Sequence, residues 1–162
     1  MLATRKDLFA RFTELGIAVE THRHPPVFTV AEAKALRGEL PGGHTKNLFL
    51  KDKKGLLWLV VAMEDRTVDL KALRAKIETP PLSFAGAELL RTVLGIEPGS
   101  VTPFALINDH EARVTPVLDA EMLRQPVLNF HPLANTATTA IAPSDLIAFI
   151  RSCGREPLIV EF

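Results

Sequence analysis

Cysteine is almost absent from this chain of 162 residues, which holds one thiol, Cys153. A single cysteine excludes an intrachain disulfide and a cysteine-rich zinc site, and it is typical of a protein from a reducing compartment. Cys153 lies late in an amphipathic segment, near Gly154 and with no histidine beside it in sequence. We therefore interpret it as a residue at the end of a helix rather than as a nucleophile.

Long apolar runs are also missing. No stretch approaches the roughly 20 apolar residues that a membrane span needs. Residues 1–16 alternate charged and apolar side chains and contain no continuous apolar core, so they do not resemble a signal peptide. The sequence therefore predicts a cytoplasmic protein with no membrane partner.

The chain has no excess charge of either sign, because 19 Lys and Arg balance 19 Asp and Glu. A neutral chain is poorly suited to coating long stretches of nucleic acid, although a local basic patch can still grip one nucleic-acid end. The five histidines show no strong zinc-binding spacing. We accordingly expect no metal and no other cofactor.

What the chain does contain is a core-forming composition, with 47% hydrophobic and 23% charged residues. This balance is typical of a compact soluble domain, and the length fits one such domain. Neither a linker nor an internal repeat is visible. We expect a single domain over residues 1–162.

Hydrophobic periodicity predicts interleaved helices and strands. A capping box at Thr4 and Asp7 opens a helix that ends at Gly16, and a second box at Thr29 and Glu32 opens a short helix over 30–37. The further helices are expected at 69–77, 86–94 and 143–153, with one or two helical turns over 119–124. The strands are expected at 17–22, 47–51, 56–63, 82–84, 104–107, 113–118, 127–131, 136–141 and 157–162.

The turn residues at 52–55 predict a hairpin between the second and third of these strands. The strand at 56–63 is apolar on both faces, which places it centrally in a sheet. Interleaved elements combined with frequent hairpins favour an α/β fold, in which helices flank a mixed sheet.

Three segments place polar groups among turn and apolar residues, and each admits a functional and a structural interpretation. Lys46 follows two glycines, where it either holds a phosphate or carbonyl as a compact cation or is an exposed lysine at a strand start. The loop at Gly99 either offers backbone N–H groups to an anion or is a structural turn. His131 either orients a substrate or is a histidine satisfied by its neighbours.

Four segments in order resemble the YbaK/prolyl-tRNA-synthetase-associated domain family, over nearly the whole chain. They are His-Pro-Pro-Val-Phe-Thr at 24–29, Gly-His-Thr-Lys-Asn-Leu-Phe-Leu-Lys-Asp at 43–52, Gly-Ser-Val-Thr-Pro-Phe at 99–104, and Leu-Asn-Phe-His-Pro at 128–132 with Asn-Thr-Ala-Thr-Thr at 135–139. The first segment most resembles the free-standing alanine-editing branch. The resemblance implies a single domain with a mixed, curved sheet.

The resemblance also implies a function, the hydrolysis of alanine from mischarged tRNA for proline. Lys46 matches the family's essential lysine, which is expected to contact the tRNA end. Gly99 and Pro103 match a Gly-x-x-x-Pro loop that directs N–H groups at the reacting carbonyl, and His131 matches a histidine that holds the aminoacyl or adenosine end. Further substrate contacts are expected from Asn47, Ser100, Val30 and Phe28, in a pocket walled by segments 27–36 and 58–62.

The family is thought to lack a protein nucleophile and to use a ribose hydroxyl of the substrate to assist a water. The chain agrees, since it shows no Gly-x-Ser-x-Gly elbow. The implied partner is the acceptor end of tRNA for proline, with prolyl-tRNA synthetase a candidate second partner. Two alternatives stay open: the same chemistry on Cys- or Ser-charged tRNA, and a non-catalytic module that binds aminoacyl-tRNA or a synthetase.

Overall fold

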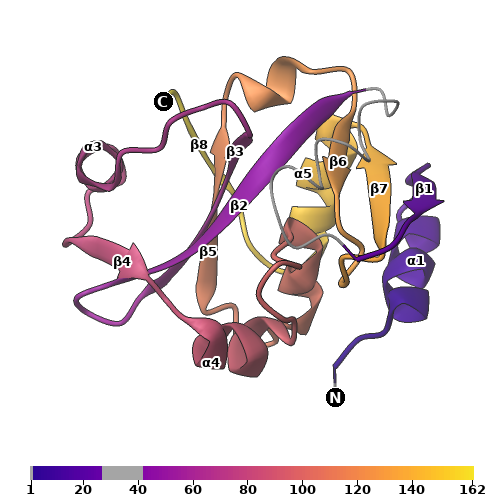
Figure 1. Ribbon diagram of the computed structural model, residues 1–162, viewed down its shortest axis with the longest axis horizontal. Helices are drawn as coiled ribbons and strands as arrows, with labels where there is room; N and C mark the ends of the chain where they lie inside the picture. Colours follow the sequence, from indigo (N-terminus) through magenta and orange to yellow (C-terminus); the bar gives the residue numbers. More distant parts are fainter. Residues whose placement is uncertain (1, 27–41) are drawn as a thin grey trace.

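An eight-stranded sheet organises the computed structural model, which describes residues 2–26 and 42–162 (Figure 1). The strands run in the order β1-β7-β6-β2-β3-β5-β8, and β4 pairs separately with β2. Their bounds are β1 (Glu20–Arg23), β2 (Gly43–Asp52), β3 (Leu57–Met63), β4 (Leu82–Phe84), β5 (Val114–Asp119), β6 (Leu128–Phe130), β7 (Ala137–Ile141) and β8 (Leu158–Val160).

The sheet mixes parallel and antiparallel pairs. β2 with β6, β3 with β5 and β5 with β8 are parallel, whereas β1 with β7, β6 with β7, β2 with β3 and β2 with β4 are antiparallel. The long strand β2 crosses the molecule and joins the two halves of the sheet (Figure 1). The expected α/β domain with a mixed, curved sheet is therefore confirmed.

The β2–β3 hairpin forms where its turn residues predict it, and β3 is buried between β2 and β5. The strand β2 nevertheless begins at Gly43, earlier than the predicted start at residue 47. Its first two residues pair with β6, Gly43 opposite Leu128 and His44 opposite Asn129. The pairing partner of Gly43 is far away in the sequence, so nothing near the glycines indicates a strand, and their composition predicts a loop.

Helices cover both faces of the sheet. The bounds are α1 (Arg5–Glu14), α3 (Leu70–Lys76), α4 (Ala87–Leu89), η1 (Leu90–Leu94), η2 (Pro103–Asn108), η3 (Met122–Arg124) and α5 (Pro143–Ser152). On one face, the main core joins α1, α5, η1 and η2 to the sheet. On the other face, α3 packs over a second, smaller core through Leu73, against Leu50 and Trp58.

Two local predictions have opposite outcomes. The capping box of α1 is confirmed, since the Thr4 hydroxyl accepts from the Asp7 N–H and the Asp7 carboxylate accepts from the Thr4 N–H. The predicted strand at 104–107 is wrong, because these residues form the 3₁₀ helix η2. Pro103 fixes φ at its first position and the Thr102 hydroxyl accepts from the Phe104 N–H, which together start a helical turn.

A short apolar run such as 104–107 is compatible with a buried strand or a buried helical turn, and periodicity alone does not separate them. The second predicted capping box and its helix at 30–37 lie outside the described residues. The remaining strands and helices form within a few residues of their predicted bounds.

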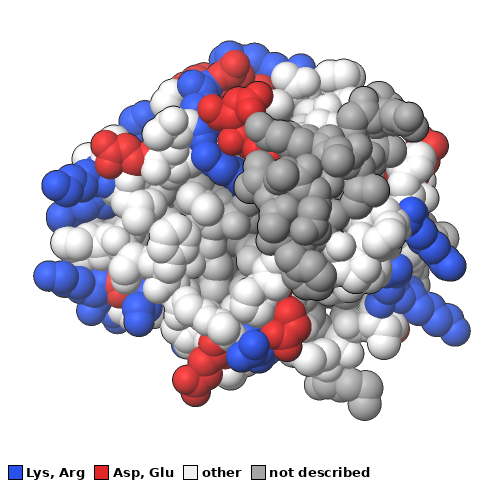
Figure 2. Space-filling model, viewed as in Figure 1, with Lys and Arg blue, Asp and Glu red and all other residues white. Residues whose placement is uncertain are grey.

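Charged side chains gather toward the edges of the face that Figure 2 shows, while uncharged residues occupy much of its centre. Lys and Arg are dense at the left margin, over α3 and the β2–β3 turn. No helix in the described part of the chain is long and apolar enough to cross a membrane.

Candidate functional site

Alternation along β2 decides which predicted residues can share a surface. Phe49 belongs to the main core and Leu50 to the second core under α3. Because successive side chains in a strand point to opposite faces, Asn47 shares the face of Phe49. Lys46 shares the face of Leu50 and lies directly opposite Ala62 of β3.

His131 directly follows β6, and the alternation of that strand, continued by one residue, puts it on the same face as Lys46. Leu128 and Phe130 of β6 point into the main core, so Asn129 and His131 point away from it. In the parallel register His44 lies opposite Asn129. Lys46 comes two residues after His44, and His131 comes two residues after Asn129.

Side chains secure this junction of β2 and β6. The Thr45 hydroxyl donates to the Asn129 carbonyl at 2.9 Å, and the Asn129 amide donates to the Gly43 carbonyl at 3.2 Å. The start of β2 and the end of β6 are therefore held together just before His131, where β6 ends.

His131 is half-buried and held in a defined orientation. Its Nδ1 lies 2.9 Å from the Ala137 carbonyl, which accepts a hydrogen bond only from a protonated Nδ1. Burial lowers the pKa of His131, and the nearby charge of His24 lowers it further, against the opposing effect of the Ala137 carbonyl. In the neutral ring Nε2 is then left as an acceptor.

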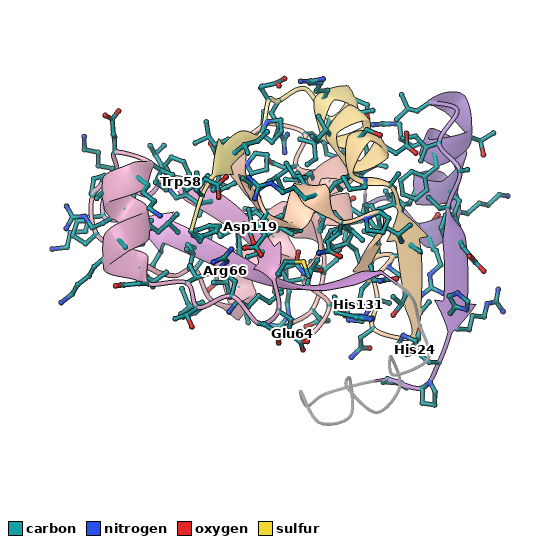
Figure 3. The ribbon with its side chains drawn as sticks, turned by 90° about the horizontal axis from the view of Figure 1, so that it is seen from above. His24, Trp58, Glu64, Arg66, Asp119 and His131 are labelled. Atoms are coloured by element: carbon teal, nitrogen blue, oxygen red, sulfur yellow. The ribbon has the colours of Figure 1, made fainter. Side chains whose placement is uncertain are left out.

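His24, which we did not predict as a site residue, stands beside this imidazole. The two rings are arranged edge to face with their centroids 6.2 Å apart. His24 Nε2 lies 2.8 Å from the Thr138 hydroxyl and its Nδ1 lies 2.8 Å from the Pro25 carbonyl. Figure 3 shows His24 and His131 along one side of the molecule, with Glu64 on the same side.

Glu64 was also missed, although the strand pattern contains its signal. It follows Met63 directly after β3, and its N–H donates to the His44 carbonyl at 2.9 Å. By alternation its side chain belongs to the face of Lys46. The sequence contained a signal for Glu64: it is an acidic residue directly after an apolar strand, and the predicted hairpin pairs that strand with the segment that contains Lys46.

The Gly99 loop approaches the segment that follows His131. A Cβ built on Gly99 would lie 3.8 Å from the Asn135 amide nitrogen, and Gly99 has φ of +90°. Downstream, η2 anchors the loop, since the Phe104 ring contacts those of Phe12, Phe130 and Phe149 at centroid distances of 5.1, 5.6 and 5.5 Å.

The N–H groups of this loop differ in availability. Ser100 is buried, and its N–H donates to the Glu97 carbonyl at 3.0 Å. Among the described residues, no hydrogen bond from the N–H of Gly99 or Val101 is found. Pro103, the last residue of the predicted motif, is buried and begins η2, so its part is to shape the loop.

Lys46 itself is half-buried, and its ammonium has no hydrogen-bond or ion-pair partner in the described part of the chain. Asn47, on the other face, has a buried Oδ1 that accepts no hydrogen bond there. Because the Lys46 ammonium has no partner among the described residues, it is available to a ligand. Asn47 lies on the opposite face of the sheet, where its unpartnered buried oxygen is costly.

The structure brings the predicted site residues together only in part. His131 and Lys46 share a face by strand register, and the Gly99 loop contacts Asn135, four residues beyond His131. Val30 and Phe28 lie outside the described residues, as does the predicted wall at 27–36. Of the other predicted wall, Trp58 and Val60 are buried in the second core, whereas Ala62 lies opposite Lys46.

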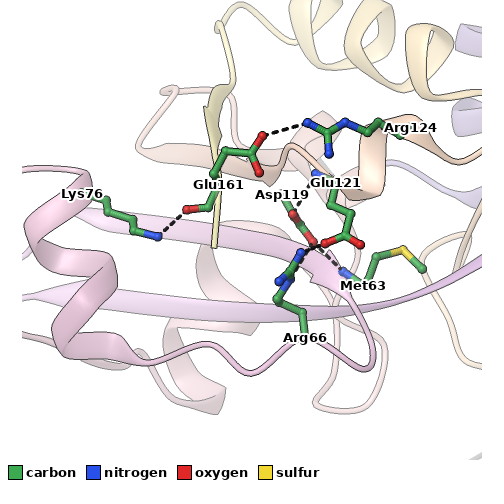
Figure 4. Close-up of polar contacts among 7 residues, drawn as sticks. All are labelled: Met63, Arg66, Lys76, Asp119, Glu121, Arg124 and Glu161. Carbon is green, nitrogen blue, oxygen red and sulfur yellow. Dashed lines mark hydrogen bonds and ion pairs between the residues drawn. The ribbon is translucent and has the colours of Figure 1, made fainter.

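A buried carboxylate holds the end of β3 near this surface. Asp119 is fully buried, and its oxygens accept from the N–H groups of Met63, at 3.3 Å, and Glu121, at 3.0 Å. Arg66 completes the cluster, with an ion pair to Glu121 and its Nε 3.9 Å from Asp119 (Figure 4). This cluster fixes the chain just after Ala62 and Glu64.

Other reactive groups fall away from this surface. Cys153 follows α5, and burial raises the pKa of its thiol above the ordinary value despite the opposing charge of Arg11. A thiol that stays protonated is a poor nucleophile. Over residues 2–26 and 42–162, no group of three or more His, Cys, Asp or Glu side chains is placed to hold a metal.

Comparison of the sequence with those of known proteins identifies its family. The sequence profile of the aminoacyl-tRNA editing domain matches residues 24–149. The prolyl-tRNA synthetase associated domain-containing protein 1 of Danio rerio is 39% identical over 160 residues, which cover 98% of this chain and 87% of that protein.

The prolyl-tRNA editing protein ProX of Acetoanaerobium sticklandii is 35% identical over 158 residues, covering 97% of this chain and 96% of that protein. A crystal structure of a candidate trans-editing enzyme for prolyl tRNA synthetase superposes with a TM-score of 0.74 at 20% identity, over 99% of this chain and 98% of that one. The chain belongs to the aminoacyl-tRNA editing domain family.

Proposed function

We propose that this chain is a deacylase that hydrolyses the ester of alanine mischarged onto tRNA for proline. The observation that carries the proposal is the shared face of Lys46 and His131, with the Gly99 loop reaching the same β6–β7 connection. Membership of the editing family and the likeness to a prolyl-tRNA editing protein support the choice of substrate.

Editing is the chemical remedy for a selection that binding cannot make. A pocket that accepts proline rejects a smaller apolar side chain weakly, because one missing methylene changes selectivity by roughly 10- to 200-fold. A second hydrolytic site removes the smaller product. Such a site needs to grip the aminoacyl end of the tRNA and not its whole length, which is compatible with a chain of zero net charge.

Each proposed role follows from the chemistry of its group. The ammonium of Lys46, which has no partner among the described residues, binds a phosphate or the terminal nucleotide as a compact cation. The N–H groups of Gly99 and Val101 stabilise negative charge that develops on the ester carbonyl oxygen. Nε2 of neutral His131 accepts a hydrogen bond from the ribose hydroxyl or the α-ammonium group of the substrate.

In this reaction a water adds to the ester carbonyl carbon and gives a tetrahedral oxyanion. The bond to the ribose oxygen then breaks, the proton lost by the water passes to that oxygen, and free alanine and tRNA are released. A neighbouring ribose hydroxyl assists the water, so the protein contributes position and electrostatic stabilisation rather than a nucleophile.

The experiment that tests this proposal is a deacylation panel in which one tRNA for proline carries alanine, cysteine, serine or proline. We expect rapid release of alanine and little release of proline. Faster release of cysteine or serine would assign the same chemistry to another substrate. Binding without turnover of any ester would identify a non-catalytic binding module, and either result would overturn the proposal. Pull-down with prolyl-tRNA synthetase tests the second proposed partner separately.

A further inference from the structure

A basic surface lies on the face of the sheet that carries Lys46, at the other end of β2. It consists of two exposed lysines in the β2–β3 turn and three cations on α3, namely Lys53, Lys54, Lys71, Arg74 and Lys76. The helix α3 packs over Leu50, which shares the face of Lys46. Figure 2 shows Lys and Arg gathered over these two elements.

The positive charge of this surface is a local excess in a chain with no net charge. Residues 53–54 and 69–81 contain five Lys or Arg and two carboxylates, Asp69 and Glu78. The Asp69 carboxylate accepts from the Lys71 backbone N–H and caps α3. The ammonium groups of Lys53, Lys54 and Lys71 have no partner among the described residues, so they are available to an anion.

The surface is also hollowed and held in place. An open groove of about 840 Å³ runs between α3 and the chain that follows it, with Lys71, Arg74 and Pro80 in its wall. The Arg74 guanidinium donates to the Thr79 carbonyl at 3.2 Å. The Thr79 hydroxyl donates to the buried Asp52 carboxylate at 2.8 Å, which ties this chain to the β2–β3 turn.

We propose that this basic surface binds the phosphate backbone of the acceptor stem whose aminoacyl end reaches Lys46; this inference rests on the proposed function. Lysines that contact phosphates position a nucleic acid without reading its sequence. Duplex RNA is recognised in this way, through its backbone and shape. The surface therefore sets how the substrate approaches, while the site at Lys46 acts on the ester.

Spacing along β2 supports this arrangement. Leu50 lies four positions after Lys46, a distance of about 13 Å at roughly 3.3 Å for each residue step of a strand. The unpaired end of a tRNA has about four nucleotides, and four stacked nucleotides span about 14 Å at roughly 3.4 Å each. With the terminal nucleotide at Lys46, the paired stem accordingly begins over α3.

The test measures binding of an uncharged RNA hairpin that copies the acceptor stem and ends in single-stranded CCA, by fluorescence anisotropy over a range of salt concentrations. Lys53→Glu and Lys71→Glu are each expected to weaken binding roughly tenfold at low salt. Each should also reduce the slope of log affinity against log salt by about 1. The matched control is Lys6→Glu, an exposed lysine on α1, across the sheet, and it should change neither value.

A second arm measures hydrolysis of an alanylated CCA trinucleotide, which lacks a stem. Lys53→Glu and Lys71→Glu should hydrolyse it at the wild-type rate while showing a raised KM for the full aminoacyl-tRNA. Binding and salt slope indistinguishable from those of Lys6→Glu would overturn the inference, as would an equal loss on the trinucleotide. The binding measurements need no turnover. If the wild-type chain hydrolyses no ester, the proposed function is overturned, while the affinities and salt slopes still test this inference.

Discussion

The imidazole rings of His24 and His131 lie edge to face, 6.2 Å apart, although the two residues belong to β-strand ends more than a hundred positions apart. Strand β7 joins them, because His24 Nε2 lies against Thr138 and His131 Nδ1 lies against the Ala137 carbonyl. A positive charge on His24 disfavours protonation of His131 and lowers its pKa.

Hydrolysis should fall at acidic pH with a midpoint below 6.5, the ordinary pKa of histidine, because burial and His24 both lower the pKa of His131. Protonation converts Nε2 from an acceptor to a donor, so the active form exists above this pKa. Single-turnover deacylation between about pH 5 and 8 measures the effect. His131→Gln should remove the acid limb, whereas His24→Ala should move it toward 6.5.

His110→Ala is the matched control for these histidine variants, since His110 is exposed in the turn after η2. It should leave the acid limb unchanged. An acid limb that persists in His131→Gln would show that another group titrates.

Lys46→Ala should reduce deacylation about 100-fold or more without unfolding the chain. Its ammonium has no hydrogen-bond or ion-pair partner among the described residues, so its removal breaks no polar contact there. Substitutions of this kind change the free energy of unfolding by about 0.5 kcal/mol or less. Lys51→Ala, on the same strand but on the opposite face and exposed, is the control. Equal activities of the two variants would rule out the role assigned to Lys46.

Gly99→Ala separates backbone strain from catalysis. Among the described residues a Cβ at Gly99 meets nothing closer than 3.8 Å, but the φ of +90° is unfavourable for alanine. Gly154 has nearly the same φ, +85°, and open space around it. Both substitutions should therefore cost roughly 1 to 3 kcal/mol in unfolding free energy, measured by urea titration.

Deacylation should respond to the two glycine substitutions differently. Gly99→Ala reorients the N–H groups that we assign to the carbonyl oxygen, so kcat should fall by about 100-fold. Gly154→Ala should leave kcat unchanged. If Gly99→Ala retains full kcat despite the lower stability, the loop has no part in stabilising the oxyanion.

Much of the fold follows from local patterns. The capping box at Thr4 and Asp7 and the turn at 52–55 each use side-chain and turn chemistry that acts within a few residues, and both form as predicted. The apolar run of β3 likewise identified the central strand. Signals of this range are contained in the sequence around the element itself.

The arrangement of the site depends on contacts that the sequence does not show. Gly43 and Asn129 are 86 positions apart, and their parallel pairing sets Lys46 and His131 on one face. A register shift of one residue would have put His131 into the main core. The segments that matter, including the one that begins at His24, could thus be identified from their motifs, whereas the contact between His24 and His131 became visible only through strand pairing.

A final prediction concerns Asp52, whose carboxylate joins the β2–β3 turn to the chain after α3. It accepts from the Lys54 N–H at 2.8 Å, the Leu56 N–H at 3.1 Å, the Trp58 Nε1–H at 3.3 Å and the Thr79 hydroxyl at 2.8 Å. Burial raises the pKa of Asp52, but these hydrogen bonds outweigh burial and leave the pKa below its ordinary value of 3.8.

A lowered pKa in the folded state means that the contribution of Asp52 to stability is present above about pH 4 and is lost as the pH falls through the folded pKa. Asp52→Ala should lower the free energy of unfolding by about 3 kcal/mol at pH 7, since it leaves several donors unpaired. Asp69→Ala, which removes an exposed helix cap, should cost about 1 kcal/mol. Urea unfolding at pH 7 and at pH 3 measures both, and the gap between wild type and Asp52→Ala should narrow at the lower pH. A gap that is equal at both pH values would show that the charge of Asp52 contributes nothing to the turn.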